Sequence, residues 1–138
     1  LEIAVQEGAT LHVGGELAED NAYFSPAVVT DIPRDSDSYY EEFFGPIAAV
    51  YKVSTDEEAL ELANDCHFGL GGAVFSEDSA RAEAIAKRLA VGMSNVNTPA
   101  GEGAELPFGG VKRSGFGREL GPLAMDEFVN KQMYFVAD

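Results

Sequence analysis

The sequence predicts an α/β fold with a largely parallel open sheet, and its alternating pattern is the main reason. Residues 47–53 are an apolar run typical of a buried strand, and the runs 71–76 and 93–97 are predicted to be further strands. Two segments with helical spacing, 55–64 and 78–90, lie between these runs. A strand–helix–strand–helix–strand order favours parallel pairing with crossover helices. At 138 residues and 46% hydrophobic content, the chain is long enough for one domain with a core.

The first forty residues predict a short helix, two strands and a long loop. Residues 1–7 resemble the end of a helix that closes near Gly8, and residues 10–13 form a strand before two glycines. Residues 16–23 are a polar loop. Residues 27–30 are a β-branched run after Pro26, which predicts a strand. Residues 31–40 contain Pro33 and alternating Asp and Ser, so we expect a loop there.

The rest of the chain carries clear helix signals. Thr55 and Glu58 have capping-box spacing, which predicts a helix that ends near Asn64. The segment 78–90 places apolar residues at i, i+3, i+4 and i+7, with Gly92 where a glycine commonly follows a helix. Pro122 suits the first turn of a last helix that runs to 129. Residues 132–136 predict a terminal strand without a partner within the chain.

Composition excludes several classes of function. The formal net charge is −15, and residues 1–65 hold 15 acidic and two basic residues, so the chain repels nucleic-acid phosphates. No apolar run approaches the roughly 18 residues that a membrane span needs, and no signal peptide is visible. One cysteine indicates a reducing compartment, so we expect a cytoplasmic protein. The chain begins as if inside a helix, which suggests a truncated sequence.

The stretch 105–121, ELPFGGVKRSGFGRELG, is the most informative part of the chain. It contains five glycines among apolar and aromatic residues, whereas flexible linkers dilute glycine with serine and other polar residues. We therefore expect a close-packed loop of defined shape. A phosphate-binding P-loop is excluded because the spacing of its motif is missing.

This stretch, together with EEFFGP at 41–46, ELANDCHFGLGGAVFSED at 61–78 and VGMSNVN at 91–97, resembles the aldehyde dehydrogenase superfamily in motif order and spacing. LPFGGVKRSGFGREL and EFVNKQ most resemble its succinate-semialdehyde dehydrogenase branch. The resemblance implies that residues 1–130 are the C-terminal part of a three-layer catalytic domain and 131–138 an oligomerisation strand. The nucleotide-binding domain, general-base Glu and nucleophilic Cys are absent from this chain, so the chain alone should be inactive.

The resemblance assigns cofactor contacts to Glu42 and Phe44. A carboxylate can accept hydrogen bonds from both hydroxyls of a ribose, and an aromatic ring can flank a nicotinamide, which implies NAD or NADP as the cofactor. The alternative is a solvated acidic loop with Phe44 in the core.

The resemblance also places Phe108 in the substrate channel, and Asn97 bracing backbone near the active site. Lys112 and Arg113, with Arg118, are the only basic cluster and candidates for recognition of a carboxylated aldehyde. Surface or intersubunit ion pairs are the alternative for these cations.

Cys66 and His67 are adjacent, but neighbouring side chains usually point apart, so we expect a buried structural cysteine and no catalytic residue or metal site in the chain. For the complete protein the resemblance implies a homo-oligomer that oxidises an aldehyde through a cysteine thiohemiacetal. Two alternatives remain open. One is a non-catalytic interaction module whose terminal strand pairs with a partner, and the other is a reductase of acyl phosphates or thioesters on the same scaffold.

Overall fold

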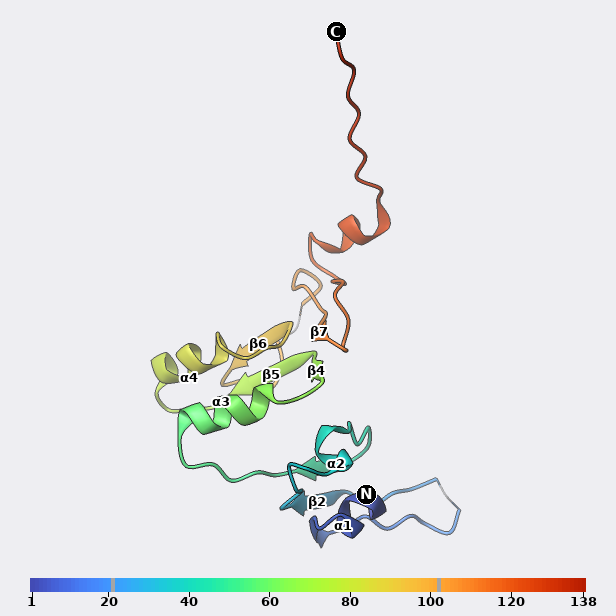
Figure 1. Cartoon of the computed structure of the whole chain (residues 1–138), viewed down its shortest axis with the longest axis vertical. Coiled ribbons are helices and arrows are strands. Elements are labelled where there is room, and N and C mark those ends of the chain that lie inside the picture. Colours follow the sequence, from blue (N-terminus) through green and yellow to red (C-terminus); the bar gives the residue numbers. More distant parts are fainter. Residues whose placement is uncertain (21, 102) are drawn as a thin grey trace. The chain divides into compact units, whose positions relative to one another are not determined.

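The computed structural model describes residues 1–20, 22–101 and 103–138. The chain divides into two compact units, residues 1–54 and 55–138. Both units combine short helices with small sheets, so the predicted α/β class is confirmed (Figure 1). No helix in the described part of the chain is long and apolar enough to cross a membrane.

The first unit is a three-stranded sheet with two short helices. Its elements are α1 (Glu2–Gln6), β1 (Thr10–Val13), β2 (Ala27–Thr30), α2 (Asp37–Tyr40) and β3 (Ile47–Ala49). The central strand β2 pairs antiparallel with β1 and parallel with β3. The buried residues are Ala4, Ala9, Val29 and Ile32, with Leu1, Tyr39, Phe43, Ile47 and Tyr51 packed around them. The predicted strands 10–13 and 27–30 are confirmed.

Helix α2 lies in the segment that we predicted to be a loop. The Ser38 amide donates a hydrogen bond to Glu7 Oε2 at 3.1 Å, from a residue 31 positions away. The Ser38 hydroxyl bonds the same carboxylate, and this contact lowers the pKa of Glu7. The Glu7 carboxylate thus accepts hydrogen bonds from the first turn of α2, where the N-cap residue Ser36 provides no side-chain cap. The prediction of a loop was wrong because the residue that binds the start of α2 is distant in the sequence and is brought near only by the tertiary structure.

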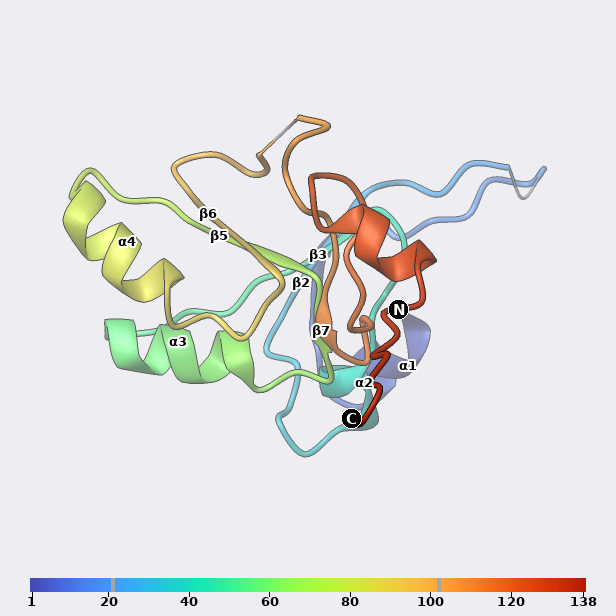
Figure 2. The ribbon, with the colours of Figure 1, turned by 90° about the horizontal axis from the view of Figure 1, so that it is seen from above.

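The second unit contains α3 (Asp56–Asn64), β4 (Phe68–Gly69), β5 (Gly71–Val74), α4 (Ser79–Ala86), β6 (Met93–Val96), β7 (Val111–Lys112) and the 3₁₀ helix η1 (Ala124–Phe128). Strands β5 and β6 are parallel, and β4 and β7 are antiparallel. Figure 2 shows α3 and α4 on the same side of the β5–β6 pair.

Both α-helices of this unit begin at side-chain caps. Thr55 Oγ1 accepts a hydrogen bond from the Glu58 amide at 3.1 Å, as the capping spacing predicted. Asp78 Oδ1 accepts from the Arg81 amide at 3.0 Å. Helix α4 ends at Ala86 and not near residue 90, so Gly92 is not its terminal glycine. A Cβ added at Gly92 would instead lie 2.0 Å from the Gly109 carbonyl oxygen, so this glycine permits a close approach of two backbones.

The sheet organisation is less regular than predicted. Within the described residues there are three separate sheets with two parallel and two antiparallel pairings, so a single, largely parallel, three-layer sheet is not confirmed. The run 47–53 forms a strand only at Ile47–Ala49, and Ala48 and Ala49 are exposed where we expected burial. The antiparallel pairings join β1 to β2 and β4 to β7, and the alternation argument did not foresee either of them.

The C-terminal part also differs from the prediction. The last helix is a 3₁₀ helix that begins at Ala124, two residues after Pro122. Residues 129–138 form no strand with the described residues, and Figure 1 shows this segment (dark red) leading away from the β5–β6 sheet. The oligomerisation strand therefore stays a prediction.

Candidate functional site

The segment around Phe44 presents a carboxylate and an aromatic ring to solvent. Phe43 packs against the core of the first unit, whereas the next residue, Phe44, is 91% exposed. Phe44 also has φ +33°, which is rare for a bulky residue and costs about 1–3 kcal/mol. Glu42 is exposed. The alternative that Phe44 belongs to the core is wrong, because Phe43 occupies that place.

The turn that carries Phe44 is fixed by backbone hydrogen bonds to the sheet. The Ala27 amide donates to the Pro46 carbonyl at 2.8 Å, and the Ile47 amide donates to the Gly45 carbonyl at 2.7 Å. Phe44 therefore projects from an anchored turn, which fixes the point of the backbone from which its ring extends. An anchored, strained and exposed aromatic residue is a common feature of binding sites. Beside it, the Glu42 carboxylate can accept hydrogen bonds from two neighbouring hydroxyl groups.

A cleft of about 440 Å³ lies in the second unit between β6 and the glycine-rich loop. Phe108 lines it and is 43% exposed. Phe108 is held in place by two backbone hydrogen bonds with Glu119, both 2.7 Å long. The cleft is lined by Gly71, Gly92, Met93, Ser94, Asn95, Pro99, Ala100, Gly101, Leu106, Pro107, Phe108, Arg118 and Leu123. This lining is mostly apolar with few polar groups, as in small-molecule sites.

The glycine-rich loop is close-packed, as its composition predicted. A Cβ at Gly109 would lie 2.4 Å from the Gly117 carbonyl oxygen, so only glycine fits there. The guanidinium of Arg118 donates from Nη1 to the carbonyls of Gly110 at 2.7 Å and Gly117 at 2.8 Å. Arg118 therefore holds the two sides of the loop together.

Asn97 joins the ends of β5 and β6. Its Oδ1 accepts from the Ser76 amide at 2.9 Å, and its Nδ2 donates to the Ser76 carbonyl at 3.0 Å. The backbone of Asn97 is in the left-handed region, with φ +56°, which Asn tolerates better than most residues. Asn97 braces backbone, although it is not among the residues that line the cleft.

The cations of the predicted basic cluster lie in different settings. Lys112 Nζ donates to the carbonyls of Asn64 at 2.8 Å and Cys66 at 3.0 Å, so its ammonium contacts backbone. Arg113 is exposed, and its amide donates to the His67 carbonyl at 3.0 Å. Of this cluster only Arg118 lines the cleft.

Cys66 lies in the connection after α3, as expected, but it is exposed and not buried. Its Sγ accepts a hydrogen bond from the Phe68 amide at 3.4 Å. No group of three or more metal-ligating side chains occurs in the described part of the chain.

Asn64 is a structural residue whose role the sequence did not reveal beyond its place at a helix end. Its Nδ2 donates to the Arg88 carbonyl at 3.0 Å, and its Oδ1 accepts from the Ala90 amide at 2.7 Å. These bonds tie the end of α3 to the segment that enters β6. The signal that could have found it is an amide, with both donor and acceptor, at the last residue of a helix.

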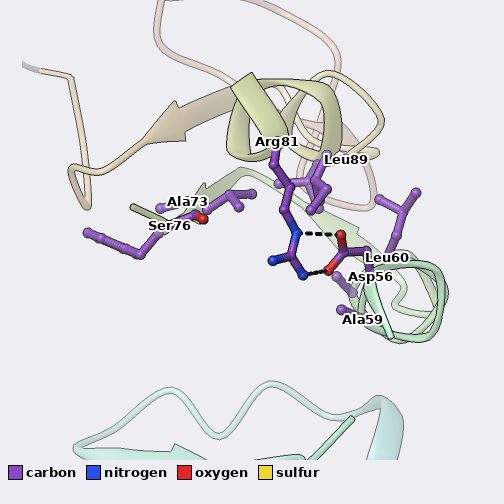
Figure 3. A pocket seen from close by; sticks show the side chains of 11 residues that line it. Asp56, Ala59, Leu60, Ala73, Ser76, Arg81 and Leu89 are labelled. Atoms are coloured by element: carbon purple, nitrogen blue, oxygen red, sulfur yellow. Dashed lines mark hydrogen bonds and ion pairs between the residues drawn. The ribbon is translucent and has the colours of Figure 1, made fainter. Parts of the chain in front are cut away.

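A second hollow of about 350 Å³ lies between α3, β5 and α4 (Figure 3). The Arg81 guanidinium bridges it with a two-pronged ion pair to Asp56, whose Nε–Oδ2 distance is 2.7 Å. Arg88 binds Glu57 in the same way at 2.6 Å. The hydrogen bonds from these arginines lower the pKa of Asp56 and of Glu57. The first pair joins α4 to α3, and the second joins the segment after α4 to α3. This hollow contains none of the predicted site residues.

Comparison with known proteins agrees with the motifs. The NADP-dependent succinate-semialdehyde dehydrogenase of Deinococcus radiodurans is 50% identical over 131 residues, which are 94% of this chain and 28% of the relative. The solved succinic semialdehyde dehydrogenase of Streptococcus pyogenes in complex with NADP⁺ superposes with a TM-score of 0.89 at 41% identity, over 99% of this chain and 30% of that one.

The solved betaine aldehyde dehydrogenase of Staphylococcus aureus in complex with NAD⁺ gives a TM-score of 0.86 at 39% identity, over 92% of this chain and 26% of that one. The chain thus spans less than a third of the length of these relatives. Residues 1–134 match the profile of the aldehyde dehydrogenase family. The chain therefore belongs to the aldehyde dehydrogenase family.

Proposed function

We propose that this chain is the C-terminal part of the catalytic domain of an NAD(P)-dependent aldehyde dehydrogenase, and that the complete protein oxidises an aldehyde to its carboxylate. The observation that carries the proposal is the anchored turn in which Phe44 is 91% exposed at φ +33° beside the exposed Glu42. A protein that had no use for this ring would bury it or relax its backbone.

Glu42 and Phe44 fit a nicotinamide ribose. The Glu42 carboxylate can accept from the two ribose hydroxyls, and Phe44 offers a ring face to the nicotinamide. When bound, the nicotinamide supplies the hydride acceptor that oxidation of an aldehyde requires. The chain's contribution in this proposal is to hold and orient, since the general base and the cysteine nucleophile lie outside these 138 residues. The isolated chain should accordingly show no turnover.

The cleft beside Phe108 is the proposed position of the aldehyde. Its lining is mostly apolar, and the close-packed glycine-rich loop fixes its shape. We propose succinate semialdehyde as the substrate, because the 50% identical relative is a succinate-semialdehyde dehydrogenase.

The test is reduction of NAD⁺ and NADP⁺ by the product of the complete open reading frame, with succinate semialdehyde and a neutral aldehyde of similar length. Faster turnover of succinate semialdehyde supports the proposed substrate. Equal turnover of both aldehydes keeps the enzyme class and contradicts the substrate. No turnover of any aldehyde contradicts the proposed function and favours the non-catalytic interaction module.

We further propose that the complete protein is a homo-oligomer. The C-terminal segment exposes a run of apolar side chains, with Met133 82%, Tyr134 86% and Phe135 76% exposed. Exposed apolar segments of this kind are typical of interfaces. Light scattering of the complete protein with and without residues 132–138 tests this: a smaller assembly after truncation supports it, and an unchanged mass contradicts it.

A further inference from the structure

Lys112 occupies a backbone conformation that does not suit a lysine. Its φ is +55°, in the left-handed region where glycine is the unstrained choice. The surrounding loop already contains five glycines, yet this position carries a long cationic side chain. A side chain retained at such a position indicates that the side chain itself has a task.

The contacts of Lys112 show which groups that task involves. Its ammonium donates to the carbonyl of Asn64, the last residue of α3, at 2.8 Å, and to the carbonyl of Cys66 at 3.0 Å. Carbonyls at a helix C-terminus lack partners within the helix and carry partial negative charge, so a cation there is favourable. Lys112 therefore joins the glycine-rich loop to the end of α3.

The end of α3 is in turn joined to the other wall of the cleft. The Asn64 side chain bonds the backbone of Arg88 and Ala90, directly before β6. The Gly92 amide donates to the Gly69 carbonyl at 3.0 Å, and the Gly69 amide donates to Ser114 Oγ at 3.0 Å. The wall formed by β6 and the wall formed by the glycine-rich loop thus attach to the same segment, residues 64–69.

The backbones of the two walls are also in close contact. A Cβ at Gly92 would lie 2.0 Å from the Gly109 carbonyl oxygen, and Phe108 precedes that residue. A displacement of β7 and the turn after it would therefore move Phe108 relative to Asn95 across the cleft. Lys112 itself does not line the cleft.

We infer that Lys112 is a positioning residue that sets the separation of the two cleft walls by binding the backbone at Asn64 and Cys66. This inference deepens the proposed function, because it takes the cleft to be the aldehyde site. It differs from recognition of a substrate carboxylate by Lys112, which was the expectation from the sequence.

The experiment compares Lys112→Met, Lys112→Arg and the control Lys87→Met in the complete protein. The Lys87 ammonium forms a surface ion pair with Glu83 at 2.6 Å, and Lys87 is not among the residues that line the cleft. Since a misplacement of about 1 Å can reduce a rate by about 10²-fold, we expect Lys112→Met to lower kcat/KM on the order of 10-fold. The loss should be equal for succinate semialdehyde and a neutral aldehyde, partly restored by Lys112→Arg, and absent in Lys87→Met.

Two results would overturn the inference. A loss confined to succinate semialdehyde would mean that Lys112 binds the substrate carboxylate. A lower melting temperature with unchanged kcat/KM would mean that Lys112 serves stability alone.

A second measurement does not depend on activity. Amide hydrogen exchange should accelerate in both 92–96 and 108–112 of Lys112→Met, and less in Lys112→Arg. Unchanged exchange in either wall contradicts the positioning role. If the wild-type protein turns over no aldehyde, the proposed function fails while this exchange experiment still decides whether Lys112 couples the walls.

Discussion

Replacement of Gly92 by alanine tests the close contact between the two walls of the cleft. The added Cβ would lie 2.0 Å from the Gly109 carbonyl oxygen and 2.7 Å from the Gly110 Cα. Ordinary contacts begin at 3.4 Å, so the backbones must separate by about 1.4 Å. Both neighbours are backbone atoms, and no side-chain rotation can relieve the contact.

Two effects of opposite sign determine the size of the change. Overpacking of a rigid site costs about 1–3 kcal/mol, and a shift larger than 1 Å places this site near the upper end. Alanine also restricts the unfolded chain, which stabilises the protein by about 0.4–1 kcal/mol. Overpacking is the larger effect, so the free energy of unfolding should fall by about 2 kcal/mol. Because Gly92 lines the cleft, kcat/KM should fall as well, by up to about 10²-fold.

Urea unfolding of the complete protein measures the change in stability, with Gly71→Ala as the matched control. Gly71 pairs with Met93 on the neighbouring strand, and a Cβ there would make ordinary contacts with the flexible Met93 Cε at 3.6 Å and the Met93 carbonyl oxygen at 3.8 Å. The control should unfold within about 0.5 kcal/mol of wild type, as expected for a substitution that creates no clash. A Gly92→Ala protein with the wild-type urea midpoint, or a control as unstable as the variant, would refute the reasoning.

Three further predictions concern the cofactor contact, the helix pair and a helix cap. Glu42→Gln should raise KM for NAD(P) by about 10-fold, because a charge-assisted hydrogen bond contributes about 1.5–3 kcal/mol; steady-state kinetics at varied cofactor measure this, and an unchanged KM argues against the ribose contact. Arg81 lowers the pKa of Asp56, so the stability from this pair is complete above the ordinary carboxyl value of 3.8 and is lost as pH falls through the lowered value. The difference in melting temperature between wild type and Asp56→Asn should therefore shrink toward pH 3, and a difference independent of pH contradicts the assignment. Thr55→Ala should cost about 1 kcal/mol because it removes the cap of α3, whereas Thr55→Ser should keep most of the stability; calorimetry compares the two, and equal losses would mean that the hydroxyl is not the relevant group.

The elements that could be predicted are those whose signals lie within the element itself or beside it in the sequence. The strands β1, β2 and β6 and the cap of α3 follow from β-branched runs, glycines and a threonine hydroxyl within a few residues. Helix α2 could not be predicted, because the carboxylate that accepts from its Ser38 amide belongs to Glu7, which is 31 residues away. Gly92 was misassigned for the same reason, since its constraint comes from Gly109.

The candidate site was only partly accessible from sequence. Two adjacent aromatic residues, Phe43 and Phe44, carry no local signal of which one enters the core, and only packing separates them. The resemblance assigned the functional place to Phe44; its ring is exposed, and the cofactor contact stays a prediction. For Lys112, composition suggested a cation available to a substrate, whereas its partners are carbonyls that the fold brings near.

The amide of Asn97 also makes this junction sensitive to chemical ageing. The side chain offers one donor and one acceptor to the Ser76 backbone, as a peptide group in a strand would. Deamidation to aspartate keeps the shape but replaces the donor with a second oxygen, which would face the Ser76 carbonyl with negative charge. The hydrogen bond from the Ser76 amide would remain, but the bond to the Ser76 carbonyl would be replaced by a repulsion where the chain leaves the sheet for the cleft. Slow hydrolysis of a single side chain can therefore loosen the exit of β6 without cutting the backbone.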